Sequence, residues 1–268
     1  MRLPRYGQGT WNMGDDRSRR AGELAALREG IALGMTLVDT AEMYGDGRSE
    51  SLVAEAIAGQ REQVFLVTKV LPSNASRKGV ARACEASLRR LKTDNVDLYL
   101  LHWSGSYPLE ETVRGFEDLV AAGKIRSWGV SNLDLAEMKQ LVALPGGSAC
   151  AANQLLYNLS RRGIELDLLP WCQERRIPVM AYSPVEQGRI LGHKALKQVA
   201  QRLGATPAQV ALAWTLRQEG VVSIPKAATV AHVRENRKAL DLELDAEALK
   251  TLDTAFPPPA KARPLEML

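Results

Sequence analysis

The chain carries the run Val96-Asp97-Leu98-Tyr99-Leu100-Leu101-His102, which is almost continuously apolar and ends on an ionisable side chain. The earlier run Val64-Phe65-Leu66-Val67-Thr68-Lys69 has the same form. Short apolar runs without polar alternation are typical of strands that are buried on both faces, as in a parallel sheet. The two runs therefore predict parallel strands that carry ionisable groups at their ends.

The rest of the chain repeats this pattern, with a short apolar run followed by an amphipathic stretch. About eight such units in about 250 residues match the count and length of a (β/α)8 barrel. A doubly wound sheet is the alternative, but Gly7-Gln8-Gly9 lacks the third glycine of its usual fingerprint. We therefore predict an α/β fold, a (β/α)8 TIM barrel that forms a single domain over residues 1–268. The predicted strands are residues 7–10, 36–39, 64–69, 96–102, 125–130, 150–154, 178–183 and 221–225.

The stretches between these runs show helical periodicity and helix-start signals. Apolar residues recur at helical spacing within residues 80–91 and 135–142. Thr206-Pro207-Ala208-Gln209 combines an N-cap threonine, a proline in the first turn and a capping-box glutamine. Asp245 is placed to cap the last helix. These signals predict helices that alternate with the strands.

The composition is that of an ordinary globular protein, with 46% hydrophobic and 25% charged residues. No apolar run approaches the roughly 18 residues of a membrane helix, so we expect no membrane partner. The first five residues lack the apolar region of a secretory signal. Cys84, Cys150 and Cys172 are an odd number without C-x-x-C spacing, which is typical of a reducing compartment. We therefore expect a cytoplasmic protein.

The net charge of +4 and the pI near 9.0 raise the question of an anionic partner. The basic residues are spread along predicted helices beside acidic ones, without a long block of like charges. This distribution favours a solvated surface, and we expect no nucleic-acid partner. A basic chain can still attract small anions such as phosphate through its local field.

Asp39, Lys69 and His102 each end a predicted strand, and Tyr44 follows Asp39 in the next loop. Chemistry in a (β/α)8 barrel gathers where strands end. A nearby ammonium lowers the pKa of a tyrosine, an aspartate holds that ammonium charged, and a neutral histidine can orient a carbonyl oxygen. The four groups together suit protonation of an oxygen as hydride adds to an aldehyde or ketone. Taken singly, they could also be a structural ion pair, a hydrogen-bonded histidine and a packed tyrosine.

Segments from one end of the chain to the other resemble the aldo-keto reductase family. The most specific are Gly123-Lys124-Ile125-Arg126-Ser127-Trp128-Gly129-Val130-Ser131-Asn132 and Ile224-Pro225-Lys226. The other matching segments, in family order, are Gly9-Thr10-Trp11, Val38-Asp39-Thr40-Ala41-Glu42-Met43-Tyr44-Gly45, Val67-Thr68-Lys69, Leu101-His102-Trp103, Asn153-Gln154 and Ala181-Tyr182-Ser183-Pro184. Trp103-Ser104-Gly105 and the turn Pro145-Gly146-Gly147 are similar to bacterial members that reduce methylglyoxal.

The resemblance implies a catalytic tetrad of Asp39, Tyr44, Lys69 and His102, with Tyr44 as the general acid. It also implies NADP(H) as the cofactor, with use of NAD(H) as well. In relatives, the residues that match Ser131, Asn132 and Gln154 hold the nicotinamide carboxamide, the match to Tyr182 stacks on its ring, and the match to Asp39 touches the ribose. The other cofactor-binding residues implied are Thr10, Ser183, Val185 and Gln187 around the pyrophosphate, and Ile224, Lys226, Ala227, His232, Glu235 and Asn236 toward the adenosine end.

The chain departs from the family pattern at the adenosine end. His232 stands where relatives usually have an arginine, and Ala227 stands where they have a hydroxyl residue. Losing a charge-assisted arginine contact commonly costs about 1.5–3 kcal/mol. Lys226 is the charge expected to meet a 2′-phosphate, with Arg234 as a candidate replacement for the arginine. We therefore expect a preference for NADP(H) over NAD(H) that is weaker than in arginine-bearing relatives.

The segments after His102 and after Phe256 are short, which predicts an open mouth. The proline-rich stretch Phe256–Pro259 is predicted to lie on the surface. Trp11, Tyr44, His102 and Trp103 are the predicted substrate-pocket residues, although the two tryptophans could instead be lids of the barrel. An open aromatic mouth favours small carbonyl compounds, with methylglyoxal and similar α-oxoaldehydes first and keto compounds such as 2,5-diketogluconate second. The chain also begins close to its first predicted strand, so we expect the hairpin that plugs the barrel bottom in relatives to be missing or trimmed.

We therefore predict an NADPH-dependent carbonyl reductase that acts as a monomer on a small carbonyl substrate. A cofactor-sensing regulatory subunit on the same fold is one alternative, and it would bind the cofactor without turnover. A metal-dependent barrel hydrolase is another, but His102, His193 and His232 fall in unrelated places and we predict no metal site.

Overall fold

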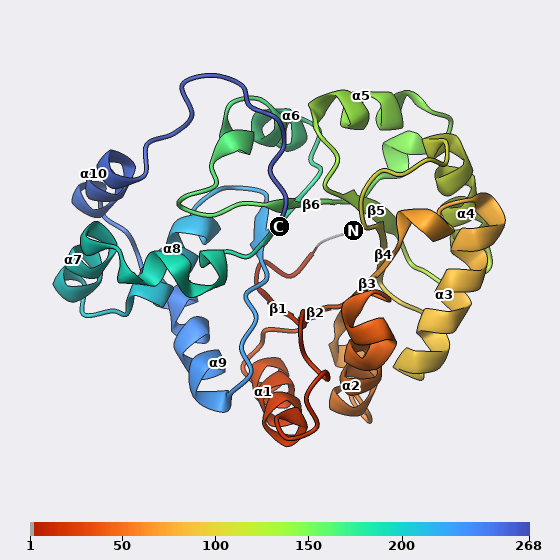
Figure 1. Ribbon diagram of the computed structural model, residues 1–268, viewed down its shortest axis with the longest axis horizontal. Helices are drawn as coiled ribbons and strands as arrows, with labels where there is room; N and C mark the ends of the chain where they lie inside the picture. Colours follow the sequence, from red (N-terminus) through yellow and green to blue (C-terminus); the bar gives the residue numbers. More distant parts are fainter. Residues whose placement is uncertain (1–2) are drawn as a thin grey trace.

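The computed structural model describes residues 3–268 and contains a ring of parallel strands surrounded by helices (Figure 1). The eight strands follow one another in chain order, and each pairs in parallel with the next. Tyr6 pairs in parallel with Ser223, and the Ser223 N–H donates to the Arg5 carbonyl at 3.2 Å, so the last strand meets the first. The predicted (β/α)8 barrel is thereby confirmed.

The strand positions agree with the predicted ones to within about three residues. The largest shift is at the sixth strand, predicted over residues 150–154, because Cys150 and its neighbours still belong to the connection that leads into it. The strands are β1 (Gly7–Gly9), β2 (Leu37–Asp39), β3 (Phe65–Val70), β4 (Leu98–Leu101), β5 (Trp128–Ser131), β6 (Asn153–Leu156), β7 (Val179–Tyr182) and β8 (Val221–Ser223).

The helices form the outer layer, and several begin at the predicted caps. Thr206 and Gln209 form a reciprocal capping box, and the Asp245 carboxylate accepts from the Ala248 N–H. Each cap satisfies backbone donors that the first turn of a helix leaves unpaired. The helices are α1 (Arg20–Ala32), α2 (Arg48–Ala56), α3 (Arg77–Leu91), α4 (Leu109–Ala121), α5 (Leu135–Ala143), α6 (Leu168–Glu174), α7 (Lys194–Arg202), α8 (Pro207–Leu216), α9 (Val230–Arg237) and α10 (Ala246–Ala255).

Two layers of apolar side chains fix this arrangement. One lies inside the ring, where residues such as Leu37, Leu98 and Met180 pack together, and the other lies between strands and helices. Successive side chains of a strand face opposite sides, so each strand contributes to both layers. Leu3 packs against the inner layer, so the segment that leads into β1 contributes to the barrel interior.

The tail after α10 turns back toward the barrel instead of staying on its outside. It runs over the ring of strands and ends near the middle of the ring in Figure 1. The Arg161 guanidinium anchors it by donating to the Glu266 carboxylate at 2.6 Å. Within residues 3–268, none of the helices combines the length and apolar character that a membrane crossing would require.

Candidate active site

Three neighbouring strands bring the predicted tetrad to one mouth of the barrel. Asp39 ends β2, Lys69 lies near the end of β3, and His102 directly follows β4. Tyr44 begins a 3-10 turn, Tyr44–Gly47, in the loop after β2. The Lys69 Nζ donates to the Asp39 Oδ2 at 2.8 Å and to the Tyr44 hydroxyl at 3.1 Å. A continuous relay therefore links the carboxylate, the ammonium and the phenol.

The Lys69 ammonium is completely buried, and its surroundings keep it charged. Burial by itself lowers the pKa of Lys69, but the Asp39 carboxylate and Tyr44 outweigh burial and hold the pKa above its ordinary value. The Lys69 Nζ also donates to the Thr40 carbonyl at 2.8 Å. Asp39 is fixed in turn by the Gln154 side-chain amide, which donates to its Oδ1 at 2.8 Å. The positive charge is thus available beside Tyr44 over the ordinary pH range.

Tyr44 differs from the sequence-based expectation in one respect. Burial raises the pKa of its phenol, and the Lys69 ammonium offsets only part of that rise, so the pKa lies above the ordinary value of 10.0. The Lys69 ammonium lowers the pKa as expected from the sequence, but burial, which the sequence does not show, raises it by more. Tyr44 is consequently protonated at neutral pH, as a proton donor must be.

His102 is held neutral. Burial, with a smaller effect from the Lys69 ammonium, lowers the pKa of His102 to about 3. Its Nδ1 is buried without a hydrogen-bond partner among the described residues. The His102 and Tyr44 rings meet edge to face, with their centroids 5.7 Å apart. A neutral imidazole beside a phenol can donate an N–H to a carbonyl oxygen and orient it.

The lowered pKa of His102 predicts a loss of stability in acid. Because the folded-state value of about 3 lies below the ordinary 6.5, protons bind the unfolded chain more readily, and the stabilisation present above 6.5 is lost as the pH falls toward 3. Through His102 alone, the free energy of unfolding changes by up to about 1.4 kcal/mol per pH unit. Urea unfolding of wild type and His102→Gln between about pH 7 and pH 4 measures it, since the variant lacks this slope. Equal pH dependence in the two proteins would contradict the assignment.

The tetrad opens into a cavity of about 910 Å³. Asp39, Tyr44 and His102 line it, whereas Lys69 lies behind them and contacts Asp39 and Tyr44. All four predicted substrate-pocket residues belong to the lining, and the Trp11 side chain is 46% exposed there. The predicted cofactor residues that the structure places in the same lining are Thr10, Asp39, Ser131, Asn132, Gln154, Tyr182, Ser183, Val185, Gln187, Ile224, Lys226 and His232.

A hydrogen-bonded group of amides occupies one side of the cavity. The Tyr182 hydroxyl donates to the Asn132 Oδ1 at 3.1 Å, and the Asn132 Nδ2 donates to the Ser131 Oγ at 3.1 Å. The Ser131 hydroxyl donates to the Gln154 carbonyl at 3.0 Å. These contacts fix the polar groups in place, which suits recognition of a planar amide.

Three predicted cofactor residues lie outside this lining. Ala227 follows Lys226 but does not reach the cavity surface. Glu235 accepts from the Thr206 hydroxyl, at the start of α8, at 2.6 Å, and the Asn236 carbonyl accepts from the Tyr6 hydroxyl, just before β1, at 2.9 Å. Arg234, the candidate replacement for the missing arginine, pairs with Glu29 at 2.7 Å. Among residues 3–268, no three His, Cys, Asp or Glu side chains gather in a way that could hold a metal ion.

The sequence analysis missed part of the cavity wall. Met267 and Leu268 line it, and the Leu268 N–H donates to the Tyr182 hydroxyl at 3.4 Å. Contacts such as Arg161–Glu266 hold the end of the tail beside the cavity, where Met267 and Leu268 remain 56% and 55% exposed. The only sequence signal was an apolar pair after a polar segment. The other lining residues not predicted are Gly9, Asn12, Met43, Pro184 and Gly188.

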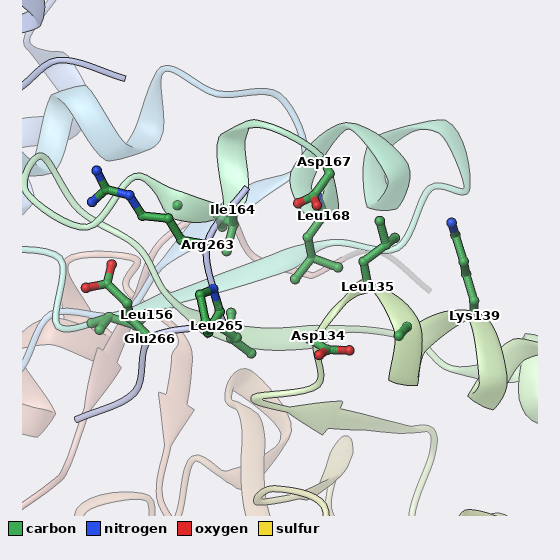
Figure 2. A pocket seen from close by; sticks show the side chains of 13 residues that line it. Asp134, Leu135, Lys139, Leu156, Ile164, Asp167, Leu168, Arg263, Leu265 and Glu266 are labelled. Carbon is green, nitrogen blue, oxygen red and sulfur yellow. The ribbon is translucent and has the colours of Figure 1, made fainter. Parts of the chain in front are cut away.

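A second cavity of about 340 Å³ lies on the other side of the tail. Figure 2 shows its lining, with Arg263, Leu265 and Glu266 from the tail facing side chains of α5 and of the α6 region. The tail is thus a wall shared by two cavities. The smaller cavity carries none of the tetrad residues.

Comparisons with known proteins agree with this geometry. The chain is 56% identical over 271 residues to methylglyoxal reductase YeaE of Escherichia coli, covering 99% of this chain and 95% of that protein. It is 31% identical over 251 residues to a glyoxal reductase of Bacillus subtilis, covering 94% and 88% of the two chains.

A solved structure has nearly the same fold. It is an aldo-keto reductase from Klebsiella pneumoniae in complex with NADPH, 50% identical, with a TM-score of 0.97 over 99% of this chain and 95% of that one. The model of the Aldo/keto reductase family matches residues 5–256, which is most of the chain. With the barrel and the tetrad in place, this chain belongs to the aldo/keto reductase family.

Proposed function

We propose that this protein reduces aldehydes and ketones to alcohols with NADPH, with methylglyoxal and similar α-oxoaldehydes as favoured substrates. The relay from Asp39 through Lys69 to Tyr44, opening on a cavity beside neutral His102, is the observation that carries the proposal. The identity of 56% to an enzyme named as a methylglyoxal reductase supports the substrate class.

Tyr44 is the proposed general acid. The substrate carbonyl oxygen accepts hydrogen bonds from the Tyr44 hydroxyl and the His102 imidazole, which polarise the carbonyl group. As hydride reaches the carbonyl carbon, the C=O π pair moves to oxygen, and that oxygen takes the Tyr44 proton. The phenolate left behind faces the Lys69 ammonium at 3.1 Å and is stabilised by it until solvent returns a proton.

The cavity has groups that fit an NADP(H) molecule. Its fixed amides, Asn132 and Gln154, match a carboxamide, the ring of Tyr182 offers an aromatic face, and exposed Lys226 offers a cation for phosphate. When bound, the nicotinamide supplies the hydride. Ser183, Val185 and Gln187 lie in the same lining and are proposed to contact the pyrophosphate. Ala227, Glu235 and Asn236 are proposed to act at the adenosine end even though they lie outside that lining.

The direct test follows NADPH absorbance with purified protein and a panel of carbonyl compounds. We expect turnover with methylglyoxal and weaker turnover with a sugar-derived keto acid. Tight binding of NADPH without turnover on any member of the panel would contradict a reductase and favour a cofactor sensor. Faster turnover of the keto acid than of methylglyoxal would overturn the proposed substrate preference.

Cofactor choice gives a separate prediction. His232 is exposed in the first turn of α9 and lines the cavity, so an arginine there could form the charge-assisted contact that histidine lacks. His232→Arg is expected to raise the NADPH-over-NADH affinity ratio by about tenfold or more. Tryptophan fluorescence titration at low salt measures both affinities, with Lys226→Met as the opposite change, expected to weaken NADPH alone. A wild-type preference of several hundredfold would contradict the reasoning.

A further inference from the structure

A buried carboxylate outside the cavity is tied to the catalytic relay. The Glu50 side chain, on α2, has no exposed surface, and both of its oxygens are paired. Its Oε1 accepts from the Thr68 hydroxyl at 2.7 Å, and its Oε2 accepts from the Arg90 Nε at 2.5 Å. Burying a charge in this way is costly unless the pairing is well formed, and nothing in the proposed reaction touches Glu50.

The two partners of this contact lead directly to the reacting groups. Thr68 precedes Lys69 on β3, and strand alternation turns Lys69 toward the barrel mouth and Thr68 toward the helix layer. Glu50 stands on α2, which begins at Arg48, where the turn that carries Tyr44 ends. The Thr68–Glu50 hydrogen bond therefore joins β3, which carries Lys69, to α2, the helix that follows Tyr44.

The turn between Tyr44 and α2 needs outside support. Gly45, Asp46 and Gly47 have φ values of +55°, +52° and +84°, so three successive residues adopt the left-handed conformation. Such a conformation is unfavourable for the aspartate, and it persists only where the surroundings impose it. Arg90 supplies a surface, because a Cβ atom added at Gly47 would lie 2.3 Å from the Arg90 Cδ. The arginine that pairs with Glu50 also packs on this turn.

We propose that Glu50 and Arg90 are positioning residues that set the distance between the Tyr44 hydroxyl and the Lys69 Nζ. The proposal rests on the proposed reaction, in which that distance, 3.1 Å, lets the ammonium stabilise the phenolate. Glu50 holds α2 against β3, and Arg90 holds the left-handed turn between Tyr44 and α2. Without them the phenol and the ammonium separate, while the cavity and its cofactor side remain.

The test uses Glu50→Gln and Thr68→Val, which keep side-chain size while removing the charge or the hydroxyl donor. Because small displacements of reacting groups cost much of their effect, we expect kcat to fall at least about tenfold, with the NADPH dissociation constant within about twofold of wild type. The pKa of Tyr44 is expected to rise, because the phenol loses the ammonium that offsets its burial, while Asp39 and His102 stay in place. NMR of isotope-labelled tyrosine, assigned with Tyr44→Phe, reads that pKa without turnover.

Asp97→Asn is the matched control. Asp97 is a nearly buried carboxylate that pairs with Arg61 and Arg126, both at 2.9 Å, beside the start of β3 and away from the mouth. The Asp97→Asn variant is expected to be less stable than wild type while keeping wild-type kcat and the wild-type pKa of Tyr44. Wild-type kcat and pKa in Glu50→Gln, or an equal loss of kcat in Asp97→Asn, would overturn the proposal. If the wild type reduces no carbonyl compound, the proposed function fails, and the pKa of Tyr44 in Glu50→Gln still decides this inference.

Discussion

Replacing Tyr44 by Phe is expected to lower kcat for the proposed reduction of methylglyoxal by at least about a hundredfold, the low end for a positioned general acid. The reason is local, because phenylalanine keeps the ring that meets His102 and removes only the hydroxyl that receives the Lys69 hydrogen bond. The substrate carbonyl oxygen then has no general acid at hydrogen-bond distance when hydride reaches the carbonyl carbon. The measurement is the rate of NADPH absorbance loss under saturating methylglyoxal.

A second tyrosine of the same cavity supplies the control for Tyr44. Tyr182→Phe removes a hydroxyl that bonds Asn132 and the Leu268 N–H, and keeps the aromatic face. We expect it to change kcat far less than Tyr44→Phe, and to act mainly on cofactor affinity. A Tyr44→Phe enzyme that turns over at the wild-type rate would remove Tyr44 from the mechanism.

Asp39→Asn is expected to impair both stability and turnover. It leaves the fully buried Lys69 ammonium without its counter-charge, and breaking a buried pair from one side typically costs about 3–5 kcal/mol. In the wild type, the raised pKa of Lys69 stabilises the fold at every pH below the ordinary 10.5, and this contribution is lost only as the pH rises through the folded value. In the variant, Tyr44 alone opposes burial, so burial lowers that pKa and the variant becomes less stable as the pH falls.

Urea unfolding near pH 9 and near pH 6 tests this direction. The free energy of unfolding that Asp39→Asn loses relative to wild type should be larger at pH 6 than at pH 9. The double variant Asp39→Asn with Lys69→Met removes both charges and should recover much of the stability. It should not recover turnover, because Tyr44 still lacks the ammonium. A double variant no more stable than Asp39→Asn would show that the ion pair is not the source of the loss.

The tetrad could be predicted from sequence because it depends on local patterns. Continuous apolar runs locate strands, their ends locate Asp39, Lys69 and His102, and the parallel barrel brings those ends together. The direction of the pKa of Tyr44 could not be predicted, since it depends on how deeply the ring is buried. The buried position of Glu50 could not be predicted either, because a glutamate in a predicted amphipathic helix is expected at the surface. Its burial follows from its partners, Thr68 on β3 and Arg90 on α3.

The tail shows the same limit. Residues after α10 have no periodicity, and long-range contacts such as Arg161 with Glu266 decide where they go. Strand bounds likewise shifted by a few residues, because apolar residues continue into the connections that flank each strand.

The position of Leu268 has a practical consequence for handling the protein. Anything fused after this residue begins within the wall of the catalytic cavity, next to the hydroxyl of Tyr182. A purification tag or reporter placed there would compete with substrate for space and distort kinetic constants.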